Sequence, residues 1–259
     1  MKLLSLNVWG GRQGKLLTDY LVKQAEGIDI FCFQEVFSSS SGLGDYRGAR
    51  VNLFAELAEL LPDYQAIFSR TYGGWVDMHP VDFEVAEGQA LFIKKSLPVK
   101  TSGQVYIHGS DTTQIIEDFS NEPKDLQYAV LEVSREDLLI ANVHGKWHPG
   151  DKLDTPERLE QSRIIKAFVD RHRGPKIICG DFNLVPETES IRMLEDKMVN
   201  LVKTYHISNT RNEISWQTYG NKQHFADFTF VSPEVKVKNF EVPYNLVSDH
   251  LPMILKFDL

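Results

Sequence analysis

The sequence predicts an α/β protein in which two packed β-sheets are flanked by helices. Short apolar runs of strand length, rich in β-branched and aromatic residues, recur from one end of the chain to the other. They outnumber the segments with helical periodicity, and some come in pairs, such as 128–133 and 138–143, joined by a short polar connection typical of a hairpin. Paired strands of this kind favour two packed sheets over a simple alternating parallel sheet.

The elements can be placed one by one along the chain. Strands are expected at 3–8, 28–33, 89–93, 128–133, 138–143, 176–179, 225–231, 237–242 and 252–257. Helices are expected at 15–25, 51–61, 155–174 and 188–196. In the third helix, Pro156 suits the first turn and Gly174 suits the end. The serine-rich stretch 38–42 is expected to be a loop.

Composition and charge narrow the class of protein. The 259 residues include 42% hydrophobic and 25% charged side chains, which is typical of a globular protein. No linker rich in proline, glycine or serine divides the chain, so we expect one domain spanning 1–259. The formal net charge of -8 argues against a long nucleic-acid footprint. A local basic patch, or a metal ion that masks acidic groups, remains compatible with it.

The cysteines and the apolar runs bear on the compartment. Cys32 and Cys179 each lie within an apolar run, as expected for small buried side chains; a disulfide between them is an alternative. No apolar run approaches the roughly 20 residues that span a bilayer, and the first residues lack the pattern of a signal peptide. We therefore expect a cytoplasmic monomer with no segment inserted in a membrane.

Polar side chains with metal-binding or acid–base chemistry stand at one end of six apolar strands. They are Asn7, Glu35, His144, Asp181 with Asn183, Asp227, and Asp249 with His250. Each of them alone would be interpreted as a turn or surface residue. Together they are the oxygen ligands that a hard divalent cation prefers, with imidazoles suited to phosphate chemistry. The set therefore predicts a metal-dependent site that acts on a phosphate ester.

The chemistry suggests a role for each side chain. Mg²⁺ needs only one or two protein carboxylates, because it keeps several waters and binds the substrate phosphate. Glu35 and Asp249 could supply these carboxylates, with Asn7 as a neutral neighbour. His250 could activate the attacking water if Asp227 orients it.

Three further residues could contact the phosphate and the water. Asp181 and Asn183 stand two positions apart, so on an extended chain their side chains would point to the same face. They could hold the water and a phosphate oxygen together. His144, if protonated, could donate to a phosphoryl oxygen as charge develops there.

Five motifs in this order resemble the endonuclease/exonuclease/phosphatase superfamily, whose fold is like that of DNase I. They are "LNVWG", "FQEVF", "NVH", "GDFNLVP" and "SDHLP", and the resemblance extends from residue 3 to 257. It implies a four-layer α/β sandwich of two mostly antiparallel sheets with helices on the outer faces. It also implies a hydrolase that acts on phosphoric ester bonds and depends on Mg²⁺ or Mn²⁺.

The resemblance also assigns roles to the strand-end residues. Glu35 resembles the principal metal ligand, with Asn7 and Asp249 beside the metal. Five residues resemble the family's catalytic groups: His144, Asp181, Asn183, Asp227 and His250.

Three segments near this set could contact substrate. After His144 the chain departs from many family members, and Lys146 and Trp147 could bind a phosphate and stack on a base or line an apolar pocket. A packed loop is the plainer interpretation. The segment 70–83 could gate the site, and 38–50, with its arginines, could reach an anion; each could equally be a surface loop.

Three functions are compatible with the sequence. We expect hydrolysis of phosphodiesters, with nucleic acid as the first candidate substrate. The same chemistry on a small or lipid-derived phosphate ester, such as an inositol phosphate or sphingomyelin, is the alternative. A binding module without catalysis is a third interpretation, disfavoured because every motif residue is present.

Overall fold

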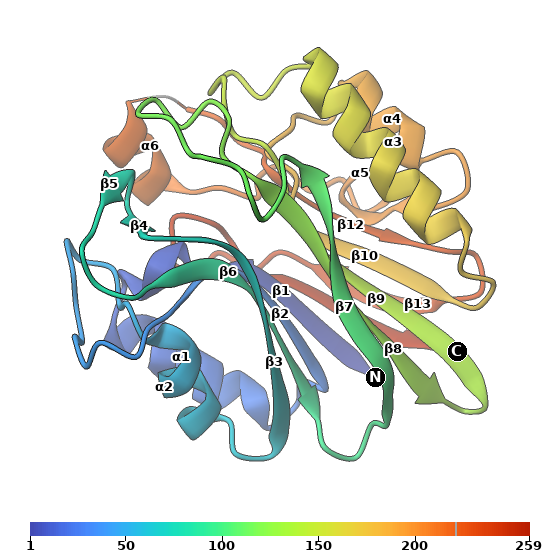
Figure 1. Cartoon of the computed structure of the whole chain (residues 1–259). Coiled ribbons are helices and arrows are strands. Elements are labelled where there is room, and N and C mark those ends of the chain that lie inside the picture. Colours follow the sequence, from blue (N-terminus) through green and yellow to red (C-terminus); the bar gives the residue numbers. More distant parts are fainter. Residues whose placement is uncertain (221) are drawn as a thin grey trace.

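The computed structural model describes residues 1–220 and 222–259, and two six-stranded sheets dominate them (Figure 1). The first sheet has the order β13 (Lys236–Glu241), β14 (Met253–Asp258), β1 (Lys2–Asn7), β2 (Ile30–Ser38), β6 (Ala86–Lys94) and β3 (Tyr64–Gly73). The second has the order β11 (Val199–Asn200), β12 (Asp227–Val231), β10 (Lys176–Asp181), β9 (Glu136–His144), β8 (Lys124–Val133) and β7 (Val99–His108). A separate small hairpin consists of β4 (Trp75–Val76) and β5 (His79–Pro80).

Helices cover the outer face of each sheet (Figure 1). The helices in the described residues are η1 (Trp9–Gly11), α1 (Lys15–Ala25), α2 (Leu53–Leu60), α3 (Pro156–Asp170), α4 (Glu189–Leu194), α5 (Leu201–Thr204) and α6 (Glu213–Tyr219). Leu17 of α1 and Leu53 of α2 share an apolar cluster with Leu4 and Phe31 of the first sheet. In Figure 1, α3 and α4 cover the second sheet. The predicted α/β fold with two packed sheets and outer helices is confirmed.

The space between the sheets is apolar at its centre. Leu3, Ile30 and Cys32 of the first sheet lie in one cluster with Ile140 and Cys179 of the second. Burying this many aliphatic side chains provides the main driving force for packing the sheets together. Both cysteines are buried and free, as the sequence suggested, and they form no disulfide.

The polar strand ends meet because each sheet contains one parallel pair of strands. β1 pairs in parallel with β2, and β9 with β10, whereas the other pairings between the described strands are antiparallel. Parallel strands present their carboxyl ends at the same edge of a sheet. Asn7 is therefore in register with Gln34, and His144 with Asp181. The two edges face each other across the sandwich, since Asn7 Nδ2 donates to Asp181 Oδ2 at 3.1 Å.

Two long strands were not expected from the sequence. β3 and β7 are the edge strands of their sheets, and several of their side chains are exposed. Edge strands of this kind carry polar side chains such as Arg70 and Gln104, which interrupt the apolar pattern used to find strands. The short helices α5 and α6 were also missed.

Several predicted boundaries were wrong, including those of β2 and α3. The strand predicted at 28–33 continues to Ser38 as β2, with a register shift between Phe33 and Val36. Helix α3 ends at Asp170, because the chain tightens at Arg171, whose N–H bonds to the carbonyl groups of Phe168 and Val169. Gly174 therefore lies beyond the helix. Among the described residues, no helix is both long and apolar enough to cross a membrane.

Candidate active site

Asn7 joins the two halves of the site. Its side chain is fully buried, and its Nδ2 donates to Glu35 Oε1 at 2.7 Å as well as to Asp181 Oδ2 at 3.1 Å. Its Oδ1 accepts a hydrogen bond from the Trp9 N–H at 2.9 Å. The amide therefore holds a carboxylate of each sheet within reach of a shared ligand.

Glu35 lies on the irregularity within β2. Its φ is +55°, a left-handed conformation that is uncommon for a residue other than glycine and concentrates at functional sites. This turn directs the side chain to the edge of the sandwich, where 28% of it is exposed. Burial in the site raises the Glu35 pKa to about 8, and the negative charges of Glu87 and Asp249 add to the effect.

His144 ends β9 beside this carboxylate. Its Nε2 lies 3.7 Å from Glu35 Oε1 and 3.4 Å from the Nζ of Lys124, a buried lysine at the start of β8. Burial lowers the His144 pKa well below its ordinary value, and the Lys124 charge lowers it further. His144 is therefore a neutral imidazole in this environment, which can donate one N–H but carries no positive charge.

Asp181 and Asn183 form both a turn and a part of the site. The Asn183 N–H donates to Asp181 Oδ1 at 2.8 Å, the side-chain-to-backbone bond typical of an Asx turn. Asn183 has a φ of +53°, and its Oδ1 accepts a hydrogen bond from Lys152 Nζ. Gly180 precedes them with a φ of +133°, and a Cβ there would lie 2.1 Å from the Val143 carbonyl oxygen.

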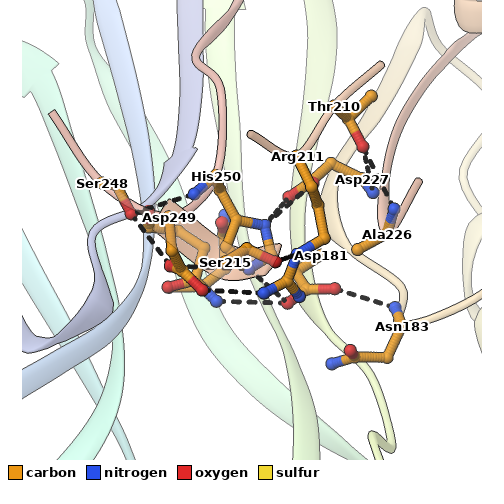
Figure 2. Close-up of polar contacts among 12 residues, drawn as sticks. Asp181, Asn183, Thr210, Arg211, Ser215, Ala226, Asp227, Ser248, Asp249 and His250 are labelled. Atoms are coloured by element: carbon orange, nitrogen blue, oxygen red, sulfur yellow. Dashed lines mark hydrogen bonds and ion pairs between the residues drawn. The ribbon is translucent and has the colours of Figure 1, made fainter. Parts of the chain in front are cut away.

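His250 and Asp227 form a buried pair (Figure 2). His250 Nδ1 lies 2.9 Å from both carboxylate oxygens of Asp227, and its Nε2 lies 3.6 Å from Asp181 Oδ2. Burial raises the Asp227 pKa to about 7 and lowers the His250 pKa to about 4. With Nδ1–H directed at Asp227, the neutral imidazole presents the lone pair of Nε2 toward Asp181.

Asp249 is engaged by a residue that the sequence did not reveal. Arg211 Nη2 lies 2.7 Å from Asp249 Oδ2, and both side chains are buried (Figure 2). Arg211 Nε also donates to Ser215 Oγ at 2.8 Å. Arg211 lies in a polar segment between α5 and α6. Its backbone pairs with that of His250, which brings it to the site. No local sequence pattern could indicate this pairing.

The two predicted substrate contacts are separated. Lys146 Nζ donates to the Ser120 carbonyl and lies 3.1 Å from His108 Nε2, and Lys146 is not among the residues that line the pocket. Trp147 does line it, with its Nε1 donating to Glu122 at 2.8 Å.

The two candidate loops also differ in their placement. In segment 70–83, Tyr72 lines the pocket, whereas Trp75 packs edge-on against Phe119 with ring centroids 5.0 Å apart. In segment 38–50, Arg50 pairs with Glu56, and the Arg47 carbonyl accepts a hydrogen bond from Arg12. Neither Arg47 nor Arg50 lines the pocket.

These side chains line a pocket of about 390 Å³ at the edge of the sandwich. Of the ten predicted site residues, nine line it or bond directly to a lining residue: Asn7, Glu35, His144, Trp147, Asp181, Asn183, Asp227, Asp249 and His250. Besides Arg211, six charged residues of its lining were missed: Arg12, Asp77, Glu87, Glu122, Lys124 and Lys152. A lysine or glutamate near the end of a strand is usually a surface residue, so sequence alone gave no reason to select them.

The donor set fits a hard divalent cation. Glu35, His144 and Asp181 each offer a ligand atom within 4.8 Å of the others, and so do Asp181, Asp227 and His250. The second group is already occupied by the hydrogen-bonded His250–Asp227 pair. In the first group, the raised pKa of Glu35 reflects buried negative charge that a cation would neutralise. Carboxylate oxygens at this position therefore suit Mg²⁺ or Mn²⁺.

A sandwich of two sheets with acidic and imidazole groups at one edge is the arrangement of a DNase I-like phosphoesterase. The chain belongs to the endonuclease/exonuclease/phosphatase family, whose model matches residues 4–250. Members of this family are hydrolases that act on phosphate ester bonds and generally depend on a divalent metal. A search of curated proteins finds no match.

Solved structures share this fold over the whole chain. An endonuclease/exonuclease/phosphatase from Bacteroides vulgatus is 20% identical with a TM-score of 0.71, covering 100% of this chain and 98% of the other. A Bacteroides thetaiotaomicron mannosyl-6-phosphatase is 16% identical with a TM-score of 0.68, covering 100% of both chains. The human Nocturnin catalytic domain is 16% identical with a TM-score of 0.65, covering 100% and 93%. At these identities the likeness shows the fold alone.

Proposed function

We propose that the chain hydrolyses phosphate esters with a water activated by His250 and with a divalent cation held by the carboxylates of Glu35 and Asp181. The main support for this proposal is that His250 lies between Asp227 and Asp181 and contacts both. His250 Nδ1 lies 2.9 Å from Asp227, and His250 Nε2 lies 3.6 Å from Asp181, which belongs to both groups of candidate ligands. The general base His250, oriented by Asp227, is therefore adjacent to the candidate metal ligands through the Asp181 carboxylate.

The His250 imidazole removes the proton from the attacking water. Because burial keeps His250 neutral, Nε2 is free to accept this proton. Asp227 fixes the tautomer by accepting Nδ1–H and stabilises the imidazolium that forms. Asp181 and Asn183 orient the water and a phosphate oxygen, and their turn and the Lys152 hydrogen bond keep them in position.

The remaining charges act on the phosphate. A bound divalent cation would act as a Lewis acid on a phosphoryl oxygen. Lys152 and Lys124 line the pocket, and the His144 N–H can donate to the same region. Donors that are fixed before the reaction stabilise the charge that develops on the phosphoryl oxygens without having to reorganise.

The pocket favours a small phosphate ester over a long nucleic acid. In the described part of the chain it is lined by four lysine and arginine side chains, and each of them also contacts a polar partner: Arg12 with Asp77, Lys124 with Glu122, Lys152 with Asn183, and Arg211 with Asp249. Flanking phosphates of a polynucleotide would need additional cations, and the net charge is -8.

The sequence alone favoured nucleic acid as the substrate, and we keep it as the second candidate substrate. Trp9 and Tyr219 line the pocket, and Trp9 Nε1 lies 3.2 Å from Tyr219 Oη. Tyr219 is 54% exposed, so its ring could stack on a base.

We also propose that residues 1–259 act as one domain and as a cytoplasmic monomer.

A substrate panel tests the proposal. Hydrolysis of bis-p-nitrophenyl phosphate, p-nitrophenyl phosphate and a fluorescent single-stranded oligonucleotide would be measured with Mg²⁺, with Mn²⁺ and with EDTA. We expect metal-dependent cleavage of the small esters, lost in Asp181→Ala and kept in the surface control Asp196→Ala. Cleavage of the oligonucleotide alone would favour the second candidate. Hydrolysis that persists in EDTA, or in Asp181→Ala, would contradict the proposed site.

A further inference from the structure

Asp249 lines the pocket, and both of its carboxylate oxygens have hydrogen-bond partners within the protein. Its Oδ2 accepts a hydrogen bond from Arg211 at 2.7 Å, and its Oδ1 accepts one from Ser248 Oγ at 3.3 Å. Neither cluster of candidate metal ligands in the described chain includes Asp249. The guanidinium of Arg211 and the hydroxyl of Ser248 thus engage one oxygen each of the Asp249 carboxylate.

Arg211 is held rigidly at the wall of the pocket. Its Nη2 bonds to Asp249 and its Nε to Ser215, and its guanidinium carbon lies 5.7 Å from the centroid of the Tyr219 ring. Its backbone forms an antiparallel bridge with that of His250, and Figure 2 shows the two side chains in the same cluster. The side chain is 7% exposed, yet it lines the pocket.

One edge of this guanidinium is available to substrate. Arg211 Nε donates to Ser215 and Nη2 donates to Asp249, whereas Nη1 donates no hydrogen bond to any of the described residues. Arginine is always charged and presents its donors in a planar fork that matches phosphate oxygens. A guanidinium fixed on one edge by protein therefore leaves its other donors for a phosphate.

We propose that Arg211 serves as the fixed second cation of this site, so that the chain binds one metal ion at Glu35 and uses the guanidinium to bind the phosphate. Asp249 is then the anchor of Arg211 and not a metal ligand. The metal part of this inference rests on the proposed function. Arg211 binds the phosphate in the ground state and stabilises the charge that develops on its oxygens during attack.

Metal binding without substrate tests the assignment of Asp249. The stoichiometry and affinity of Mn²⁺ would be measured by titration calorimetry for the whole chain and for Glu35→Gln, Asp249→Asn and the surface control Asp19→Asn. We expect one Mn²⁺ per wild-type chain, an affinity lost by roughly tenfold or more in Glu35→Gln, and an almost unchanged affinity in Asp249→Asn. Two Mn²⁺ per wild-type chain, or equal losses in Asp249→Asn and Glu35→Gln, would overturn the inference while leaving the proposed function intact. Unchanged binding in Glu35→Gln would instead refute the metal site of the proposed function, together with the inference that rests on it.

Kinetics and unfolding of Arg211 variants provide the second test. In Arg211→Lys and Asp249→Asn we expect kcat to fall by about 10² and KM to rise, with Mn²⁺ affinity maintained. Thermal unfolding of each metal-free variant shows whether the fold persists. If Arg211→Lys folds and retains wild-type kcat and KM, the guanidinium does not contact the phosphate and the inference is wrong.

Discussion

The raised pKa of Glu35 predicts that metal binding depends on pH. The carboxylic acid has a pKa of about 8 in the metal-free fold, mainly because it is buried and secondly because Glu87 and Asp249 are nearby. A metal ion binds the carboxylate, so it must displace this proton whenever the pH lies below about 8. Affinity should therefore fall as the pH is lowered through that value.

The size of the effect follows from the fraction of carboxylate. With a pKa of about 8, about half of Glu35 is carboxylate at pH 8 and about 1% at pH 6, so affinity should fall by up to roughly 50-fold, or about 2.3 kcal/mol, between these two values. Because 28% of the Glu35 side chain is exposed, solvent screening makes this an upper limit. His144 adds little to the dependence, since its lowered pKa keeps it neutral across this range.

Calorimetry measures both the affinity and the proton. Mn²⁺ titrations at pH 6, 7 and 8, each in two buffers of different ionisation enthalpy, give the affinity and the number of protons released. We expect close to one proton released per ion at pH 6 and fewer at pH 8. An affinity that is constant from pH 6 to pH 8, with no proton released, would refute the reasoning about Glu35.

Three further predictions concern the buried groups of the site. Asp227→Asn should lower kcat by about 10²–10⁴ because it removes the carboxylate charge that stabilises the protonated His250; unchanged kcat in a steady-state assay would contradict this role. Gly180→Ala should destabilise the fold by roughly 2–4 kcal/mol in urea unfolding, because its Cβ would meet the Val143 carbonyl oxygen at 2.1 Å and its φ is +133°; a shift below about 0.5 kcal/mol would count against the close packing of β9 and β10. Because its folded pKa exceeds its ordinary value of 4.5, Glu35 favours the fold at low pH. The metal-free protein should therefore melt at lower temperature as the pH rises toward 8, and Glu35→Gln should reduce this dependence.

The sequence predicted the parts of the site that lie at regular strand ends. Asn7, His144 and Asp181 each terminate an apolar strand, and the structure places all three at one edge of the sandwich. Their convergence follows from the two parallel strand pairs, which bring four carboxyl ends to this edge. At these strand ends the local sequence pattern agrees with the order of strands in the sheets, so the sequence alone was sufficient to predict that these side chains lie together.

The sequence did not reveal the features that depend on distant contacts. The position of Glu35 depends on an irregularity in β2 with a positive φ, which no turn residue such as glycine marks in the sequence. Arg211 and Lys152 reach the pocket from irregular segments through partners 38 and 31 residues away in the chain, Asp249 and Asn183. Pairings of that range are set by the tertiary structure, and single-sequence patterns do not contain them.

The most direct test of the account is the metal-dependent hydrolysis of bis-p-nitrophenyl phosphate by the wild-type protein and by His250→Gln. The exposed His206→Gln serves as the matched control. We predict hydrolysis with Mg²⁺ or Mn²⁺ that EDTA abolishes, a loss of kcat of about 10²–10⁴ in His250→Gln, and no loss in His206→Gln. Metal-dependent hydrolysis that His250→Gln leaves intact would contradict the claim that this imidazole activates the attacking water.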